Sequence, residues 1–433
     1  MLARRKFVSS LSRYAIAAPM LRPDAFRRLF EANAYAGSSA SFALADDEEY
    51  WAQIQRAFDD DHSVVNLNNG GVSPAPTHVL EAMIKDLRFS NMIPVDHMWN
   101  VLEPRVEVAR RRLADMFGCD PEEMAITRNA SEAQENMILG LDLKRGDEVI
   151  ITNQNYGRMI TTWEQRERRD GIVLKRLSFK VPPPSPSNTY LVDLFRNAIT
   201  PRTRVIEITH ITNLTGQIFP VRDIVRMARE RGIITFVDGA HAFAHFPFTR
   251  DELDVDYYGT SLHKWLHAPI GTGFLYVRRD KIKSLWPLMA APAKMDGDIR
   301  KFEEIGTHPA ANHNAITLAV AFNQSMGLER KAARLRFLRD RWAKRVLAES
   351  DKVHVLTPLN NTDSCGIAMV NIDGVDTAKL QQYLWTKHKV FTVSIIHPEF
   401  HGLRVTPSVY TLRDEVDLFA DLMIQVAKKG LPA

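Results

Sequence analysis

An aspartate and a lysine, 26 residues apart, carry the clearest chemical signal in the sequence. Asp238 directly follows the strand-like run Ile233–Val237, and Lys264 lies in the run Ser261-Leu262-His263-Lys264-Trp265. A lysine amine forms imines with aldehydes, and a carboxylate beside a ring nitrogen favours the protonated ring, which accepts the electrons of a carbanion. Together these residues are the recurring protein contribution to pyridoxal phosphate chemistry. Each one alone is more often a strand cap or a surface charge.

A second pattern is typical of a binding site for a phosphate. The strand-like run Met124–Thr127 is followed by the start of a helical pattern, Arg128-Asn129-Ala130-Ser131-Glu132-Ala133. Free amides at a helix N-terminus bind anions, and Ser261 and His263 add donors from the lysine segment. We therefore expect one phosphate to be held from two sides. The simpler alternative is that Ser131 only caps the helix.

The elements that must position these residues alternate between strand and helix. Strands are expected at Met124–Thr127, Glu148–Thr152, Ile172–Leu177, Val205–Thr209, Ile233–Val237 and Gly273–Val277. Helices are expected between them, at Ser131–Leu141, Met159–Arg168, Leu191–Ile199 and Val221–Arg231. This alternation predicts an α/β fold with a mostly parallel sheet flanked by helices, and ligands at the carboxyl ends of its strands.

The character of the sequence changes after about residue 310. A long helical pattern runs from Asn314 to Glu349 with many arginines on its outer face. Two strand candidates and a last helix follow, at Ile367–Ile372, Lys389–Val393 and Asp414–Lys429. We predict a smaller C-terminal α+β domain over residues 311–433, after a large domain over residues 46–310 that begins with an N-terminal arm, residues 46–68.

The net charge of +4 is concentrated at the N-terminus. Residues 1–45 hold seven basic and two acidic side chains, a net charge of +5, which leaves −1 for the other 388 residues. A nearly neutral body does not attract polyanions, so no nucleic-acid partner is expected. With two cysteines and no apolar run of about 18 residues, we expect neither a disulfide framework nor a membrane span. No metal site is predicted.

The basic N-terminal segment resembles an export signal. Arg4-Arg5 is followed by an apolar stretch from Tyr14 to Leu21, and Ala43-Leu44-Ala45 matches a small-x-small cleavage pattern. We therefore expect residues 1–45 to be a twin-arginine leader and the protein to be periplasmic or exported. Arg13 directly precedes this stretch and interrupts the wider apolar region, which favours the alternative of an amphipathic N-terminal helix on a cytoplasmic protein.

Several motifs, taken in order, resemble the class V aminotransferase family of fold-type I pyridoxal phosphate enzymes, and within it the isopenicillin N epimerase-like group. The matching runs are Asn66–Gly71, Ile126–Ala133, Gly140–Val149, Asp238–His241, Ser261–Trp265, Gly271–Gly273, Gly306–Thr307 and Arg404–Ser408. The resemblance spans about residues 50–425. It implies pyridoxal 5'-phosphate as cofactor, bound in the large domain.

The resemblance also implies a role for each matching residue. Lys264 would hold the cofactor as an imine (the internal aldimine) and move the α-proton, Asp238 would pair with the ring nitrogen, and His241 would contact the ring hydroxyl. Further cofactor contacts would come from Ala130, Ser131, Tyr156, Asn213, Ser261, His263 and Thr307. Tyr156 would stack on the ring; a buried core tyrosine is its alternative.

Substrate binding and assembly follow from the same resemblance. Arg404 would clamp the substrate carboxylate, with Asn213 and Asn69 nearby. Gly306-Thr307 would reach the cofactor phosphate of a neighbouring subunit, which implies a homodimer with shared active sites.

The implied activity is that of a pyridoxal phosphate enzyme acting on an amino acid or aminoacyl substrate. Epimerisation, transamination, C–S or other β-elimination and oxidative deamination stay open, as does a non-catalytic binding module. Cysteine desulfurases of this class carry a cysteine shortly before the carboxylate-binding arginine, whereas residues 394–403 contain none. Persulfide chemistry is therefore not expected. Cys119 and Cys365 are interpreted as structural, and His397 and His401 as packing residues more than proton carriers.

Overall fold

A seven-stranded sheet forms the centre of the large domain in the computed structural model, which describes residues 44–432. Its strand order is β2-β8-β7-β6-β5-β3-β4. The strands are β2 (Met124–Thr127), β3 (Glu148–Thr152), β4 (Val173–Leu177), β5 (Thr203–Thr209), β6 (Ile234–Asp238), β7 (Tyr257–Ser261) and β8 (Gly273–Val277). Neighbours are parallel except at β8, which runs antiparallel to β2 and β7. The predicted mostly parallel sheet is confirmed.

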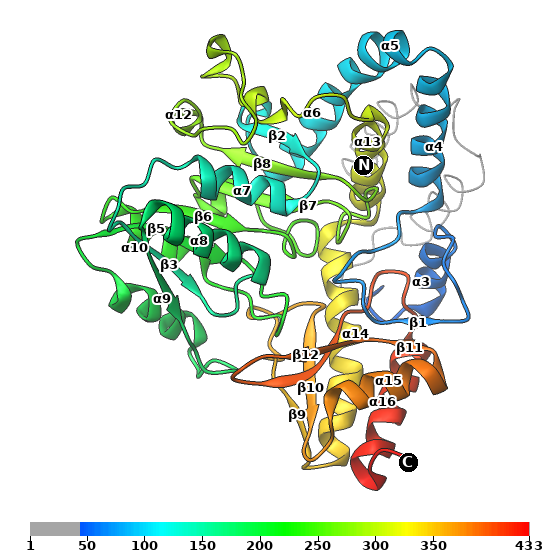
Figure 1. Ribbon diagram of the computed structural model, residues 1–433. Helices are drawn as coiled ribbons and strands as arrows, with labels where there is room; N and C mark the ends of the chain where they lie inside the picture. Colours follow the sequence, from blue (N-terminus) through cyan, green and yellow to red (C-terminus); the bar gives the residue numbers. More distant parts are fainter. Residues whose placement is uncertain (1–43, 433) are drawn as a thin grey trace, which may run out of the picture.

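Helices cover both faces of this sheet because its strands are apolar on both sides. In β3, Val149 and Ile151 join one buried cluster, while Ile150 between them joins the other. The first cluster takes in α7 (Ala130–Gly140) and α8 (Gly157–Asp170). The second takes in α4 (Thr77–Met92), α6 (Val106–Phe117), α9 (Ser187–Ala198), α10 (Val221–Arg229) and α13 (Ala310–Met326). The alternation of side chains along a strand thus produces three layers (Figure 1).

Short helices complete the large domain and connect its layers. They are α5 (Pro94–Asp96), η3 (His97–Leu102), η4 (Glu103–Arg105), η5 (Pro121–Glu123), α11 (Arg250–Leu253), α12 (Arg279–Ile282), η6 (Ala293–Met295) and η7 (Ile299–Glu303). The N-terminal helix α3 (Glu48–Gln55) packs with Phe322 of α13 and Tyr410 in a small cluster of its own.

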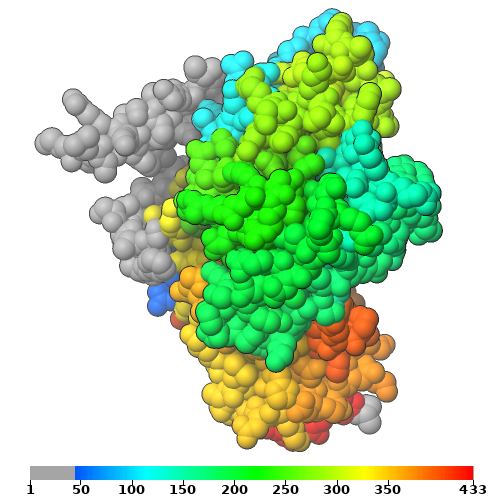
Figure 2. Space-filling model, turned by 90° about the vertical axis from the view of Figure 1, so that its left-hand side faces the viewer, coloured from blue at the N-terminus to red at the C-terminus, as the bar shows by residue number. Residues whose placement is uncertain are grey.

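The small domain contains a four-stranded antiparallel sheet of order β12-β13-β10-β9. Its strands are β9 (Val353–Val355), β10 (Ala368–Ile372), β12 (Val393–Ile396) and β13 (His401–Val405), and its helices are α15 (Thr377–His388) and α16 (Arg413–Lys429). The N-terminal arm joins this domain, because β1 (Val65–Asn66) pairs with β11 (Val390–Phe391) and Leu67 enters its core. The small domain forms the lower end of the molecule (Figure 2).

The predicted single helix from Asn314 to Glu349 is wrong, because the structure has two helices there. Gly327, with a φ of +84°, separates α13 from α14 (Leu328–Glu349). The prediction of an arginine-rich outer face is also wrong in part, since the side chains of Arg334 and Arg339 are fully buried. One end of α14 packs in the core of the large domain and the other end in the core of the small domain.

The predicted leader lies outside the described residues except for its last two. Leu44 is buried, and its carbonyl oxygen accepts a hydrogen bond of 2.6 Å from Nε1 of Trp51. The carbonyl oxygen of Ala45 accepts one from Arg334. The leader stays a prediction, and its expected boundary falls within a packed segment. Between residues 44 and 432, no helix is long and apolar enough to cross a membrane.

Candidate active site

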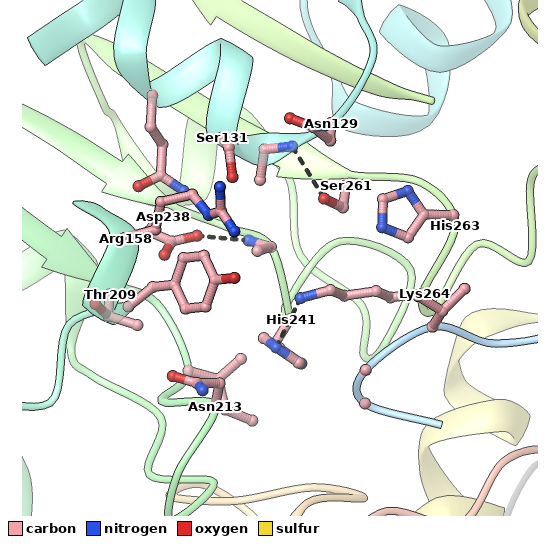
Figure 3. A pocket seen from close by; sticks show the side chains of 18 of the residues that line it. Asn129, Ser131, Arg158, Thr209, Asn213, Asp238, His241, Ser261, His263 and Lys264 are labelled. Atoms are coloured by element: carbon pink, nitrogen blue, oxygen red, sulfur yellow. Dashed lines mark hydrogen bonds between the residues drawn. The ribbon is translucent and has the colours of Figure 1, made fainter. Parts of the chain in front are cut away.

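A cavity of about 550 Å³ opens at the carboxyl ends of the central parallel strands (Figure 3). It is lined by Gly70, Gly71, Val72, Asn129, Ala130, Ser131, Gln134, Tyr156, Arg158, Thr209, Ile211, Asn213, Asp238, Ala240, His241, Ser261, His263, Lys264 and Arg404. Every residue predicted for the site lines this cavity except Asn69 and Thr307. The cavity forms where the ends of β5, β6 and β7 face the first turns of α7 and α8.

The amine of Lys264 is within hydrogen-bond distance of a histidine that also lines the cavity. Its Nζ lies 2.9 Å from Nε2 of His241. Burial lowers the pKa of Lys264 to about 8, with Asp238 opposing this shift and Arg404 adding to it. Burial, together with the charge of Lys264, lowers the pKa of His241 well below its ordinary value. At neutral pH a neutral imidazole therefore meets an amine that loses its proton far more readily than a surface lysine does.

Asp238 ends β6 with its carboxylate at the cavity, as predicted. Its Oδ1 accepts a hydrogen bond of 2.9 Å from the amide of Ala240. Burial raises the pKa of Asp238, while this amide, the charge of Lys264 and the Gln134 side chain lower it. The carboxylate is thus buried, oriented and close to a positive charge, as a partner for a protonated ring nitrogen must be.

Glu207, which the sequence interpretation did not single out, is a second buried acid behind Asp238. It lies on the neighbouring strand β5 and accepts hydrogen bonds from Nδ2 of Asn155, at 2.8 Å, and from Nε1 of Trp163. Burial raises its pKa to about 8, and the charge of Asp238 adds to the shift. The signal that was overlooked is a glutamate inside the apolar run Val205–Thr209.

The two segments predicted to hold a phosphate, the start of α7 and the lysine segment, lie side by side in the structure. Asn129 caps α7 by accepting a hydrogen bond of 2.9 Å from the amide of Glu132, and the amide of Ala130 donates one of 2.9 Å to Oγ of Ser261. The backbone approach is close: a Cβ atom at Gly273 would lie 2.8 Å from the backbone of Asn129. Glycine is therefore required at this position.

Two residues at the start of α8 line the cavity. Tyr156 is 42% exposed and is one of the lining residues, which excludes the alternative of a core tyrosine. Arg158, in the first turn, was not predicted. Its guanidinium has no hydrogen bond or ion pair with any other residue between 44 and 432, so its charge is available to an anion bound in the cavity.

Arg404 reaches the cavity from β13 of the small domain. Its Nη1 donates to the carbonyl oxygen of Asn213 at 3.0 Å, and its Nη2 donates to Oδ1 of Asn68 at 2.8 Å. Burial lowers its pKa to about 10, so the guanidinium stays charged at neutral pH. Both acceptors are neutral, which leaves the positive charge free to attract a carboxylate.

Two predicted contacts lie elsewhere. Asn69 is fully buried, does not line the cavity, and bonds to Asn66, Thr406 and Tyr410. The prediction that Asn69 lies beside the substrate is therefore wrong. Asn68, one residue earlier, is the asparagine that contacts Arg404. Thr307 lies on the surface beside a different cavity, of about 520 Å³. It therefore does not contact the site of its own chain.

The cysteines and the loop histidines keep the structural roles expected of them. Cys119 is half-buried at the end of α6 and Cys365 is fully buried, and neither lines the cavity. His397 stacks on Phe400, with ring centroids 4.4 Å apart. His401 begins β13 outside the cavity.

Pyridoxal phosphate fits the groups that line the cavity. Within the described part of the chain, several buried polar atoms here lack a hydrogen-bond partner: Oε1 of Gln134, Oγ1 of Thr209, Nδ1 of His241, Nδ1 of His263 and Nε of Arg404. Buried polar atoms of this kind are normally satisfied, so their concentration around one cavity indicates a polar ligand. A helix N-terminus for a phosphate, a carboxylate for a ring nitrogen and a lysine for an aldehyde match this cofactor.

Comparisons with known proteins agree with this chemistry. Isopenicillin N epimerase from Streptomyces clavuligerus is 29% identical over 380 residues, 84% of this chain and 95% of the relative. Cysteine desulfurase from Haloferax volcanii is 25% identical and covers 84% of this chain and 89% of its own.

Solved structures share the fold. Cysteine desulfurase from Thermococcus onnurineus superposes with a TM-score of 0.76 at 21% identity, over 87% of this chain and 98% of its own. The cystine C-S lyase C-DES superposes with a TM-score of 0.73 at 21% identity, over 84% and 98%. Residues 65–394 match the family model described as Aminotransferase class-V. The chain thus belongs to the class V aminotransferase family and is a pyridoxal phosphate-dependent enzyme.

Proposed function

We propose that the enzyme acts on an α-amino acid or aminoacyl substrate and that Lys264 moves the proton of the α-carbon. One observation carries this proposal: a lysine amine 2.9 Å from a neutral imidazole shares a cavity with a charged arginine that has only neutral partners. The arginine binds a carboxylate, and the amine is a base beside it.

Arg404 orients the substrate. A planar guanidinium binds a carboxylate through two parallel hydrogen bonds and so fixes its direction. Asn68 and Asn213 hold the guanidinium in place through their two hydrogen bonds. The α-carbon next to that carboxylate then lies within the cavity that Lys264 lines.

Pyridoxal phosphate, when bound, supplies an electron sink that stabilises negative charge at the α-carbon. Asp238 keeps a proton on the ring nitrogen by its negative charge. Nζ of Lys264, with a pKa of about 8, takes up and returns the α-proton, because a base with a pKa near the working pH transfers protons efficiently. Neutral His241 faces this amine without repelling it.

The similarity to isopenicillin N epimerase supports removal and return of the α-proton as the net reaction. β-Elimination is the second candidate, supported by the shared fold of the cystine C-S lyase C-DES. Neither of the two cysteines in the sequence lines the cavity, and elimination is compatible with this because it needs no thiol from the protein.

An amino-acid panel in deuterated water, followed by mass spectrometry, separates these reactions. Deuterium at the α-carbon without a new product indicates epimerisation, a keto acid indicates transamination or oxidative deamination, and pyruvate with ammonia indicates elimination. Lys264→Ala is the control and should give none of them. If the wild type, loaded with cofactor, shows neither a visible absorbance band nor any of these products, the proposal is wrong and a binding module remains.

We further infer that two chains form a homodimer with shared active sites. Thr307 does not contact its own site and lies beside a cavity lined by Trp99, one of several exposed apolar side chains of α4, α5 and η3. Met92, Ile93 and Val95 are 74%, 56% and 63% exposed in the single chain. Exposed apolar surface of this kind marks protein interfaces. Light scattering of the purified protein tests the dimer, and a monomer contradicts it.

We also propose export through the twin-arginine route, because the first 45 residues contain the pair Arg4-Arg5 and carry a net charge of +5. N-terminal sequencing of the protein from its native host tests this. An intact Met1 or Leu2 contradicts it.

A further inference from the structure

His245 contacts three segments that meet behind the active-site lysine. Its Nδ1 lies 2.8 Å from the carbonyl oxygen of His241. Its Nε2 lies 2.9 Å from the amide nitrogen of Gly366, which lies two residues before β10 of the small domain. Its ring stacks on Trp265, the neighbour of Lys264, with centroids 3.6 Å apart and planes 5° apart. The side chain is fully buried.

These contacts determine the protonation state of His245. A backbone amide only donates hydrogen bonds, so Nε2 accepts the one from Gly366 and carries no hydrogen. The hydrogen is therefore on Nδ1, which donates it to the carbonyl oxygen of His241. Burial and the positive charges of Lys331, Arg336 and Arg339 lower the pKa of His245 well below its ordinary value, in agreement with a neutral ring.

The backbone after Lys264 is held from the other side as well. Nζ of the buried Lys331 donates to the carbonyl oxygen of Trp265, and Nδ2 of Asn323 donates to that of Leu266 at 2.8 Å. The stacked ring of His245 adds a side-chain contact between Trp265 and the segment that carries His241.

We propose that His245 is a positioning residue for Lys264. It ties the small domain, through Gly366, to both His241 and Trp265, so that Nε2 of His241 stays opposite the lysine amine and water stays out from behind it. The same small domain carries Arg404 on β13, which pairs with β10 next to Gly366. The small domain, which carries the arginine proposed to bind the substrate carboxylate, thereby also sets the position of the Lys264 amine.

Removal of this contact should make the amine of Lys264 harder to deprotonate. The titratable and charged groups around that amine are Asp238, His241, His263 and Arg404. His245 carries no charge, so its loss acts through geometry and hydration only. A less rigid and more hydrated amine moves back toward the ordinary lysine pKa.

The test measures how fast the full chain, freed of cofactor, captures added pyridoxal phosphate at different pH values, followed by visible absorbance. The wild type should show a midpoint near pH 8. For His245→Phe, which keeps a ring and loses both hydrogen bonds, we expect a midpoint about one unit higher. At pH 7.5 this corresponds to capture about eightfold slower. His245→Asn restores a donor toward His241 and should recover part of the loss.

Two further variants keep the test decisive. Gly366→Ala perturbs the contact from the small domain, since its Cβ would lie 3.0 Å from Nε2 of His245, and should shift the midpoint in the same direction. His210→Phe is the matched control: His210 is equally buried, and none of its described side-chain contacts is to His241, Trp265 or Gly366. Equal midpoints in His245→Phe, Gly366→Ala and His210→Phe would overturn the proposal, whatever their stabilities.

Discussion

The amide of Ala130 donates a hydrogen bond of 2.9 Å to the hydroxyl oxygen of Ser261, across 131 residues of sequence. It joins the N-terminus of α7 to the segment of the lysine. The two segments predicted to hold a phosphate are therefore joined before any ligand binds, which would reduce the entropy that binding must overcome.

Ser261→Ala should raise the dissociation constant of pyridoxal phosphate by about 5- to 30-fold, because it removes one phosphate donor and the link to Ala130. Titration of the visible absorbance measures it. Ser90→Ala, which changes an exposed hydroxyl outside the cavity, is the control and should bind as the wild type does. An unchanged constant for Ser261→Ala would contradict the two-sided site.

Asp238→Asn should lower kcat by about 10²- to 10³-fold while the protein still binds cofactor. The asparagine oxygen still accepts the hydrogen bond of Ala240, but the negative charge that holds a proton on the ring nitrogen is gone. Deuterium exchange at the α-carbon measures the loss. Exchange at the wild-type rate would exclude the assigned role.

Lys264→Met should abolish the visible band and all exchange, yet raise the Tm of the cofactor-free protein at pH 7. The folded pKa of about 8 is below the ordinary lysine value of 10.5, so burying this amine disfavours the folded state wherever the amine is charged. The gain should shrink above pH 8, as the folded protein loses that proton. Calorimetry at pH 7 and pH 10 tests both the sign and the trend.

Arg404→Gln should raise KM for amino acids with a free carboxylate by about 10- to 100-fold. The corresponding carboxamides should be affected little, because they have no charge for the guanidinium to bind. Arg404→Lys should not restore binding fully, since an ammonium lacks the two-pronged geometry. Equal effects on acids and amides would place the carboxylate elsewhere.

Arg334→Met should cost about 3–5 kcal/mol of unfolding free energy at pH 7, because it leaves the Glu48 carboxylate without its buried partner. Arg334 lowers the pKa of Glu48, so this contribution is lost as the pH falls through the folded pKa. Denaturant unfolding of Arg334→Met, Glu48→Gln and the double variant measures the coupling. Additive losses would show that the pair contributes nothing beyond packing.

Most of the cavity lining that comes from the large domain could be predicted from the sequence, because local sequence signals determine it. Asp238 follows an apolar strand, Ser131 opens a helix, and Lys264 lies in a short motif. The small-domain side depends on long-range pairing instead. The strand that carries Arg404 was not predicted, because a short strand with a glycine near its start has no clear alternation.

The exchange of Asn68 for Asn69 has a similar cause. Neighbouring residues of an extended segment point to opposite sides, so one position decides whether a side chain contacts Arg404 or packs in the interior. That register is fixed by the contact of Asn68 with Thr406, more than 300 residues away. Arg158 was missed because an arginine in a first helical turn looks like any solvated charge.

The buried position of Leu44 bears on where a leader peptidase would have to cut this chain. A peptidase that cuts after Ala45 would remove Leu44 together with the oxygen that Trp51 binds, and the hydrogen bond from Arg334 to Ala45 would end with it. The shortened chain would carry a cavity beside Trp51 and a loosened α3, at a cost typical of deleting a buried leucine. A cut a few residues earlier preserves these contacts, so the fold itself favours a mature protein that keeps Leu44.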